Sequence, residues 1–282
     1  MGTSQCTISK HFRATDRGAP RQDSFLGLTR GTDNRFRAPH RAFYSTPKVV
    51  ADYTDLTGLT PAEEFLFNRY LHQGMRILDV GVGCGRTTPF LSSLATGYTG
   101  MDLSEPMIDI CRSRFPDHKF LVLDASERWQ FADALSLDAV VFSYNGIDDL
   151  QPDAKRWAFL KECSRTLVPG GVLIFSVHNP LALFPPVKYR VPGINVLRLL
   201  AHDALVWSRI FRALLFSRAF WRKAGYYINP YDRLPTHAAV PAKVIQETNS
   251  AGFTFLELVG CLYPRSSSKW RTPWNYFAFR RA

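Results

Sequence analysis

The chain has 282 residues, of which 46% are hydrophobic and 13% aromatic, so it can bury a sizeable core and is not intrinsically disordered. It carries 35 Lys and Arg against 24 Asp and Glu, a formal charge of +11, which raises nucleic acid, anionic membrane and acidic substrates as partners. The five cysteines show no C-x-x-C pair and no metal-ligand spacing. This pattern favours free thiols, a cytoplasmic location and no bound metal.

The first 41 residues are predicted to form a flexible basic arm. They contain eight Lys and Arg against three Asp, and they show no apolar periodicity and no hydrophobic segment of a secretory signal. Residues 42–282 are expected to form one domain. Within it, a helix is expected over Ala42–Tyr53, with Ser45 or Thr46 as its cap, and a second helix over Pro61–Leu71.

Residues 76–88 predict a strand, a glycine-rich turn and a helix. The apolar run Arg76–Val80 has the length of a buried strand, three glycines follow it, and a helix is expected from about Thr87. Glycine permits positive φ and lets a ligand approach the main chain, and the first amides of the helix remain unpaired. Such a unit holds nucleotide-like cofactors at the carboxyl end of a parallel sheet.

The glycine spacing argues against a dinucleotide. The turn reads G-x-G-x-G, and Arg86 stands where the dinucleotide pattern G-x-G-x-x-G has its last glycine. Asp79, just before the turn, would repel a pyrophosphate but is suited to bind an ammonium group.

Further strands follow in order, each ending at small or polar residues. The predicted strands and the residues after them are Tyr98–Met101 before Asp102, Lys119–Leu123 before Asp124 and Ala125, Asp138–Phe142 before Ser143 to Gly146, and Val172–Val177 after the turn Leu167–Gly171.

This order and spacing resemble the class I S-adenosylmethionine-dependent methyltransferases over Met75–Asn179, about a third of the chain. The resemblance implies an α/β fold: a seven-stranded Rossmann-like sheet, mostly parallel with an antiparallel last strand, and helices on both faces. It also implies S-adenosylmethionine as the cofactor and S-adenosylhomocysteine as the product.

The resemblance assigns residues to three parts of the cofactor: Asp79 and the glycines to the methionine end, Asp102 to the ribose, and Asp124 with Ala125 to the adenine. In the family that the chain resembles, an aromatic-rich N-terminal helix closes over the methionine end of the cofactor, which makes Tyr44 and Tyr53 candidates for this role. Packing on the core is the alternative role for both. The full set of predicted cofactor-binding residues is Tyr44, Asp79, Gly81, Gly83, Gly85, Asp102, Leu103, Asp124, Ala125, Ser143 and Asn145.

Residues 180–240 form an insertion after the fifth predicted strand, and we expect it to be a helical lid over the substrate. Its segment Ile194–Lys223 is both apolar and basic, and no 18 consecutive residues of it are uncharged, which excludes a transmembrane helix. Three interpretations of this segment stay open: a lid, an amphipathic surface that docks on a membrane, and a nucleic-acid contact. On a helical wheel most of the other basic residues of this segment form one polar arc. Arg218 falls outside that arc, which favours two helices rather than one.

The C-terminal part returns to the core pattern. A helix is expected over Pro241–Ser250, with Gly252 as its stop, and strands over Phe253–Gly260 and Trp274–Phe279. In the family that the chain resembles, the last two strands pair antiparallel.

Three residues are candidates for catalysis. Methyl transfer requires in-line alignment within about 3–3.5 Å, and a neutral acceptor must lose a proton to a base. His178, at the carboxyl end of the fifth strand, is the first candidate for the base, His237 is the second, and Asp148 is the third. The alternatives are a hydrogen bond to a loop carbonyl for His178 and a helix cap for Asp148.

The sequence therefore predicts an S-adenosylmethionine-dependent methyltransferase with a small-molecule, glycan or lipid-linked acceptor, and oxygen is the favoured acceptor atom. Peripheral membrane contact through 194–223 is part of this prediction. The motif at Ser143–Asn145 is not N-P-P-Y, which makes a nucleic-acid acceptor less favoured. The alternatives are an RNA methyltransferase that uses the basic arm and the insertion, and a cofactor-binding scaffold without catalysis.

Overall fold

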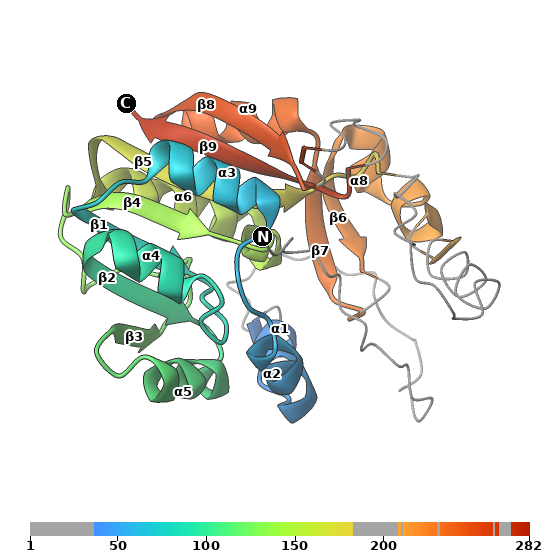
Figure 1. Cartoon of the computed structure of the whole chain (residues 1–282). Coiled ribbons are helices and arrows are strands. Elements are labelled where there is room, and N and C mark those ends of the chain that lie inside the picture. Colours follow the sequence, from blue (N-terminus) through green and yellow to red (C-terminus); the bar gives the residue numbers. More distant parts are fainter. Residues whose placement is uncertain (1–36, 183–207, 210, 230–231, 262, 265–271) are drawn as a thin grey trace.

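The computed structural model describes residues 37–182, 208–209, 211–229, 232–261, 263–264 and 272–282. Its main feature is a seven-stranded sheet with helices on both faces (Figure 1). The strands are β1 (Met75–Val80), β2 (Ala95–Asp102), β3 (Lys119–Val122), β4 (Leu137–Phe142), β5 (Leu167–His178), β6 (Ala224–Ile228), β7 (Pro235–Ala239), β8 (Phe253–Gly260) and β9 (Trp274–Arg281). The helices are α1 (Arg37–Tyr44), α2 (Pro47–Thr54), α3 (Pro61–Tyr70), α4 (Thr88–Leu94), α5 (Glu105–Arg114), the 3-10 helix η1 (Gly146–Asp149), α6 (Asp153–Thr166), α8 (Arg218–Arg222) and α9 (Pro241–Ser250).

The strand order of the main sheet is β3-β2-β1-β4-β5-β9-β8. Strands β1 to β5 pair in parallel, and β9 pairs antiparallel with both β5 and β8. The predicted seven-stranded, mostly parallel sheet with an antiparallel last strand is confirmed.

Alternation of side chains along the central strands creates an apolar core on each face of the sheet. On β1, Leu78 and Val80 face one core and Ile77 faces the other. The first core also contains side chains of α6 and α9, such as Phe159 and Val244. The second contains side chains of α3, α4 and α5. Because both faces are covered, the open side of this sheet is the edge where the parallel strands end.

A buried ion pair joins helix α3 to the turn after β1. The two guanidinium nitrogens of Arg86 lie 2.7 Å from the two carboxylate oxygens of Glu63, whose side chain is fully buried. Burial alone would raise the pKa of Glu63, but the charge and hydrogen bonds of Arg86 hold it below its usual value. The guanidinium also lies 5.0 Å from the ring centroid of Tyr144. Arg86, which stands where a dinucleotide site has its last glycine, thus fixes the turn to α3.

The N-terminal boundary differs from the prediction. Helix α1 begins at Arg37, inside the segment predicted to be a flexible arm, and is separated from α2 by a break at Ser45 and Thr46. Thr46 occupies the N-cap position of α2, as expected, and Pro47 follows it. The rest of the predicted arm, residues 1–36, lies outside the described residues.

The insertion contains β-structure that the sequence did not predict. Strands β6 and β7 form an antiparallel two-stranded sheet of their own, next to helix α8. Part of the insertion is helical, as predicted: residues 208–209 and 211–215 are helical, and α8 begins after Ser217. The oxygen of Ser217 accepts a hydrogen bond from the amide of Phe220, so the run consists of two helices. Positions 194–207 of the predicted segment lie outside the described part.

The turn predicted over Leu167–Gly171 interrupts the pairing of β5 rather than preceding the strand. Leu167 pairs with Leu137 and Val172 pairs with Ala139, so the residues between them fall outside the regular ladder. Within the part of the chain that the structure describes, no helix has the length and apolar character needed to cross a membrane.

The buried ion pair gives a stability prediction. We expect Arg86→Ala to lower the free energy of unfolding by about 3–5 kcal/mol, because it leaves the carboxylate of Glu63 buried without its charged partner. Urea denaturation measures this loss. As a matched control, Arg112→Ala removes an exposed ion pair and should cost less than about 1 kcal/mol. Equal losses for the two variants would contradict the assignment.

Candidate active site

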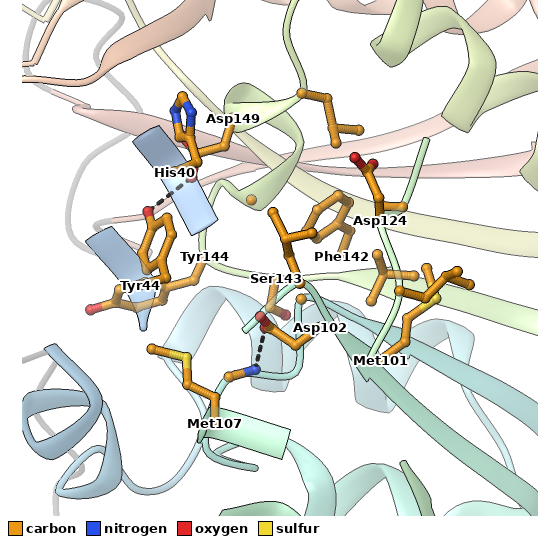
Figure 2. A pocket seen from close by; sticks show the side chains of 18 of the residues that line it. His40, Tyr44, Met101, Asp102, Met107, Asp124, Phe142, Ser143, Tyr144 and Asp149 are labelled. Carbon is orange, nitrogen blue, oxygen red and sulfur yellow. Dashed lines mark hydrogen bonds and ion pairs between the residues drawn. The ribbon is translucent and has the colours of Figure 1, made fainter. Parts of the chain in front are cut away.

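A pocket lies where the carboxyl ends of β1, β2 and β4 meet helices α1 and α2 (Figure 2). Most of the predicted cofactor residues line it: Tyr44, Gly81, Gly83, Asp102, Leu103, Asp124, Ala125 and Ser143. Three of the predicted residues, Asp79, Gly85 and Asn145, are outside its lining. Strands that are distant in sequence thus bring the predicted residues to one place.

Two glycines of the turn have both a backbone and a packing reason to lack a side chain. Gly81 has φ of +62°, and a Cβ there would lie 2.5 Å from the ring of Phe142. Gly83 has φ of +57°, and a Cβ would lie 3.3 Å from the ring of Tyr53. The positive φ values agree with the prediction from the glycine spacing. The main chain of the turn therefore forms part of the pocket wall.

Asp102 organises the floor of the pocket. Its Oδ2 accepts a hydrogen bond of 2.9 Å from the amide of Gly83, and its Oδ1 accepts one of 2.9 Å from the amide of Ser104. The first of these bonds is drawn in Figure 2. Burial raises the pKa of Asp102, and the bonds from these amides oppose this effect. The carboxylate joins the end of β2 to the glycine turn and has further lone pairs for a ligand hydroxyl.

Asp124 lies at another side of the pocket, after β3. Its Oδ1 accepts hydrogen bonds from the amide of Ser126 at 2.9 Å and from the hydroxyl of Ser126 at 2.6 Å. The ammonium group of Lys155, on α6, lies 3.3 Å from its Oδ2. Lys155 also lines the pocket. Ala125 provides an apolar surface beside these charged groups.

Asp79 is buried behind the pocket wall. Its Oδ2 accepts hydrogen bonds from Thr87 at 2.6 Å and from Tyr98 at 2.9 Å. Its Oδ1 is buried and has no hydrogen-bond partner among the described residues. Burial raises the pKa of Asp79 to about 6, although the bonds from Thr87 and Tyr98 oppose it. Asp79 therefore retains one acceptor for a cationic ligand group.

Helices α1 and α2 cover the pocket. The hydroxyl of Tyr44 donates a hydrogen bond of 2.8 Å to Oδ2 of Asp149, which Figure 2 shows. The ring nitrogen Nε2 of His40 lies 3.5 Å from Oδ1 of the same carboxylate. The hydroxyl of Ser104 donates a bond of 3.0 Å to the carbonyl of Tyr44. Helix α1, which precedes the sheet in sequence, is thus attached to the segments after β2 and β4.

The three predicted catalytic residues meet around one carboxylate. Asp148 is fully buried; its Oδ2 lies 2.8 Å from Nδ1 of His178 and accepts the backbone amide of His178 at 2.7 Å. Its Oδ1 lies 3.3 Å from Nδ1 of His237 and 3.3 Å from the guanidinium of Arg156. Burial would raise the pKa of Asp148, but the hydrogen bonds from His178 and His237 hold it below its usual value.

This arrangement defines the tautomer of His178. Because the ionised Asp148 accepts from Nδ1, the proton of the neutral ring is on Nδ1 and Nε2 has a free lone pair. The side chain of His178 is 25% exposed, whereas that of His237 is 6% exposed. His178 is therefore the more accessible of the two histidines, and His237 is a buried partner of Asp148.

Aromatic rings connect His178 to the pocket. The ring centroid of His178 lies 6.3 Å from that of Tyr227 and 6.4 Å from that of Trp274. Trp274 lies 6.4 Å from Tyr144, which lines the pocket. His178 is not itself part of the pocket lining, and the ring of Trp274 stands between it and Tyr144 of the lining.

Sequence reasoning did not find several residues of the site. His40 falls in the segment predicted to be an arm, and Lys155 and Arg156 are in helix α6, where the sequence analysis identified no site residue. Two adjacent basic residues such as Lys155 and Arg156 are common on helix surfaces, so only their tertiary contacts show their role. No cluster of three or more His, Cys, Asp or Glu residues with a metal-binding arrangement occurs in the described ranges.

Comparisons with known proteins agree with this geometry. Residues 77–171 match the family model described as a methyltransferase domain. The chain is similar to a ubiquinone biosynthesis O-methyltransferase of Coxiella burnetii, with 31% identity over 110 residues, 38% of this chain and 45% of that protein. It is also 29% identical over 195 residues to a demethylmenaquinone methyltransferase of Beutenbergia cavernae, covering 64% of this chain and 78% of that protein. The chain spans about half the length of the first of these relatives.

Solved structures share the fold. A 1,6-didemethyltoxoflavin-N1-methyltransferase of Burkholderia thailandensis superposes with a TM-score of 0.58 at 16% identity, covering 91% of this chain and 93% of that chain. An S-adenosylmethionine-dependent methyltransferase of Mesorhizobium loti gives a TM-score of 0.56 at 17% identity, covering 78% and 98%. Residues 77–171 thus match a methyltransferase domain, and the chain shares its fold with S-adenosylmethionine-dependent methyltransferases. The part of the chain that matches the family model runs from β1 to the start of β5, and the insertion lies outside the matched part.

Asp102 is the residue whose loss should affect cofactor binding most. We expect Asp102→Ala to weaken binding of S-adenosylhomocysteine at least about a hundredfold, because the carboxylate both fixes the Gly83 amide and faces the pocket. Isothermal titration calorimetry measures the loss. Asp109→Ala, which removes an exposed carboxylate on α5, should bind normally. Normal binding by Asp102→Ala would refute the ribose assignment.

The raised pKa of Asp79 gives a pH prediction. Its pKa of about 6 exceeds the ordinary 3.8, so the native protein binds this proton more tightly than the unfolded chain does. Protonation between pH 6 and 4 therefore favours folding but removes the negative charge that would attract an ammonium group. We expect cofactor affinity to fall as the pH is lowered through about 6 while this site does not destabilise the fold. In Asp79→Asn this fall should disappear; if the slope remains, another group causes it.

Proposed function

We propose that this chain is an S-adenosylmethionine-dependent methyltransferase that acts on a small-molecule acceptor. The observation that carries the proposal is the pocket, in which the glycine turn, Asp102 and Asp124 converge at the carboxyl end of the sheet. In the proposed complex, Asp102 binds the ribose hydroxyls, Asp124 and Ala125 face the adenine, and the glycine turn and Asp79 hold the methionine end. The cofactor, when bound, supplies an electrophilic methyl group.

The chain's own residues position the acceptor and remove its proton. We assign His178 as the general base, because its Nε2 has a free lone pair and its ring is joined to the pocket residue Tyr144 through the ring of Trp274. As the methyl group is transferred, the acceptor O–H bond breaks and its proton passes to Nε2. Asp148 stabilises the imidazolium that results and prevents rotation of the ring. This role requires an acceptor that loses a proton, and it favours a hydroxyl group.

The surroundings of His178 support an acceptor with an apolar body. Tyr227 and Trp274 flank the base, and these rings offer apolar area rather than charge. The names of the similar proteins refer to ubiquinone, demethylmenaquinone and toxoflavin chemistry, which supports a small molecule. A lipid-linked acceptor also fits this environment better than a free glycan does. The RNA hypothesis depends on the basic arm, most of which lies outside the described residues.

The base assignment predicts a specific kinetic effect. We expect His178→Ala to lower kcat by about 10²–10⁴-fold, with unchanged affinity for S-adenosylhomocysteine, because only proton removal is lost. Asp148→Asn should give a comparable loss, because an amide in that place favours the proton on Nε2. The assay is transfer of radiolabelled methyl groups into an extract of the source organism, separated into organic, small aqueous and nucleic-acid fractions.

The control for this prediction is His72→Ala, which alters an exposed histidine before the amino end of β1, away from the carboxyl end where the pocket lies, and should keep full activity. Full activity of His178→Ala would exclude a role as base. Label that disappears on nuclease treatment would replace the small-molecule acceptor by RNA. Cofactor binding without label in any fraction would support the scaffold alternative.

A further inference from the structure

The most exposed large apolar side chains in the described part of the chain lie close together in sequence, in the insertion. Phe216 is 80% exposed, Trp221 is 70% exposed and Ile228 is 56% exposed. They lie on and beside α8 and β6, at the end of the molecule opposite β3 and α5 (Figure 1). Exposed aromatic side chains grouped in this way mark an interaction site more often than a random surface does.

The segment that carries these rings is basic. Residues 208–223 contain five Lys and Arg and no Asp or Glu. Arg218 and Arg222 are separated by one helical turn, and Trp221 lies between them on the same face of α8. Arg218, Trp221 and Arg222 are all exposed. We call the group Phe216, Arg218, Trp221, Arg222 and Lys223 the α8 surface.

The opposite side of α8 is firmly packed. Ala219 is fully buried and joins a small core with Leu214, Tyr227 and Ala238. The rings of the α8 surface therefore face outward on an anchored helix and cannot turn inward without breaking this core. The indole nitrogen of Trp221 donates a hydrogen bond of 2.9 Å to the carbonyl of Leu215. Its polar atom is already satisfied, so the ring can enter an apolar medium without losing a hydrogen bond to water.

We propose that the α8 surface binds the anionic surface of a phospholipid membrane. Its basic side chains are opposite in charge to lipid phosphates. Its two aromatic rings are of the kinds, Trp and Phe, that are favoured at the headgroup–acyl boundary. A nucleic acid would use the same charges and would stack its bases on the rings, whereas the exposed aliphatic side chain of Ile228 offers no stacking face. The satisfied nitrogen of Trp221 and the 80% exposed Phe216 favour lipid. This inference concerns docking and does not depend on methyl transfer.

The test uses the full chain with vesicles of phosphatidylcholine, with and without phosphatidylglycerol. We expect cosedimentation with the phosphatidylglycerol vesicles only, and a fall of about tenfold or more in the partition coefficient for Phe216→Ser/Trp221→Ser. Arg218→Glu/Arg222→Glu should give a similar fall. Thermal unfolding of each variant shows whether the fold is kept.

A second measurement identifies the contacting residue, because the basic arm could also attract vesicles. Brominated phosphatidylcholine in the vesicles should quench tryptophan fluorescence, and the quenching should be lost in Trp221→Phe. The matched control is Trp157→Phe, which alters a 38% exposed tryptophan beside Lys161 on α6 and should retain the quenching.

Three outcomes would overturn the proposal. The first is absence of wild-type binding to the anionic vesicles. The second is quenching that persists in Trp221→Phe, since another segment would then make the contact. The third is binding of a single-stranded oligonucleotide that Phe216→Ser/Trp221→Ser weakens while vesicle binding stays unchanged, which would assign the α8 surface to nucleic acid.

Discussion

The buried carboxylate of Asp148 is the constraint on which the part of the molecule around the proposed base depends. A fully buried negative charge is costly unless donors surround it. Here the donors come from the end of β5, from β7 and from α6, through His178, His237 and Arg156. Arg156 is held in turn by Glu247 of α9, at 2.7 Å. The charge therefore fixes the relative positions of four elements that are far apart in sequence.

The cofactor half depends on backbone geometry, and for this reason much of it could be predicted from the sequence. Positive φ at Gly81 and Gly83 is a local property, and the strand ends at Asp102 and Asp124 follow from the apolar runs before them. The antiparallel pair β8–β9 was predicted from the same patterns together with the family resemblance. These features need no knowledge of distant contacts.

The remaining features depend on tertiary contacts that no local pattern records. The hairpin β6–β7 has mixed apolar and polar residues, and its inward side is defined by the core it shares with α8. Helix α1 has a basic sequence with few apolar positions, and it is held in place by His40 and Tyr44 against Asp149. His178, His237 and Asp148 were each identified as candidates, but only the fold shows that Asp148 is the common partner of the two histidines.

The contact of His237 with Asp148 has a consequence for protein engineering. Insertions of this kind are natural units to exchange between related enzymes when a new acceptor specificity is wanted. In this chain the hairpin is not a separable unit, because it supplies one of the donors that satisfy a charge inside the catalytic core. A chimera that replaces β6 and β7 must therefore keep a donor at position 237, or Asp148 will lose a partner beside the proposed base. Under the proposed roles, acceptor specificity and catalysis cannot be exchanged separately.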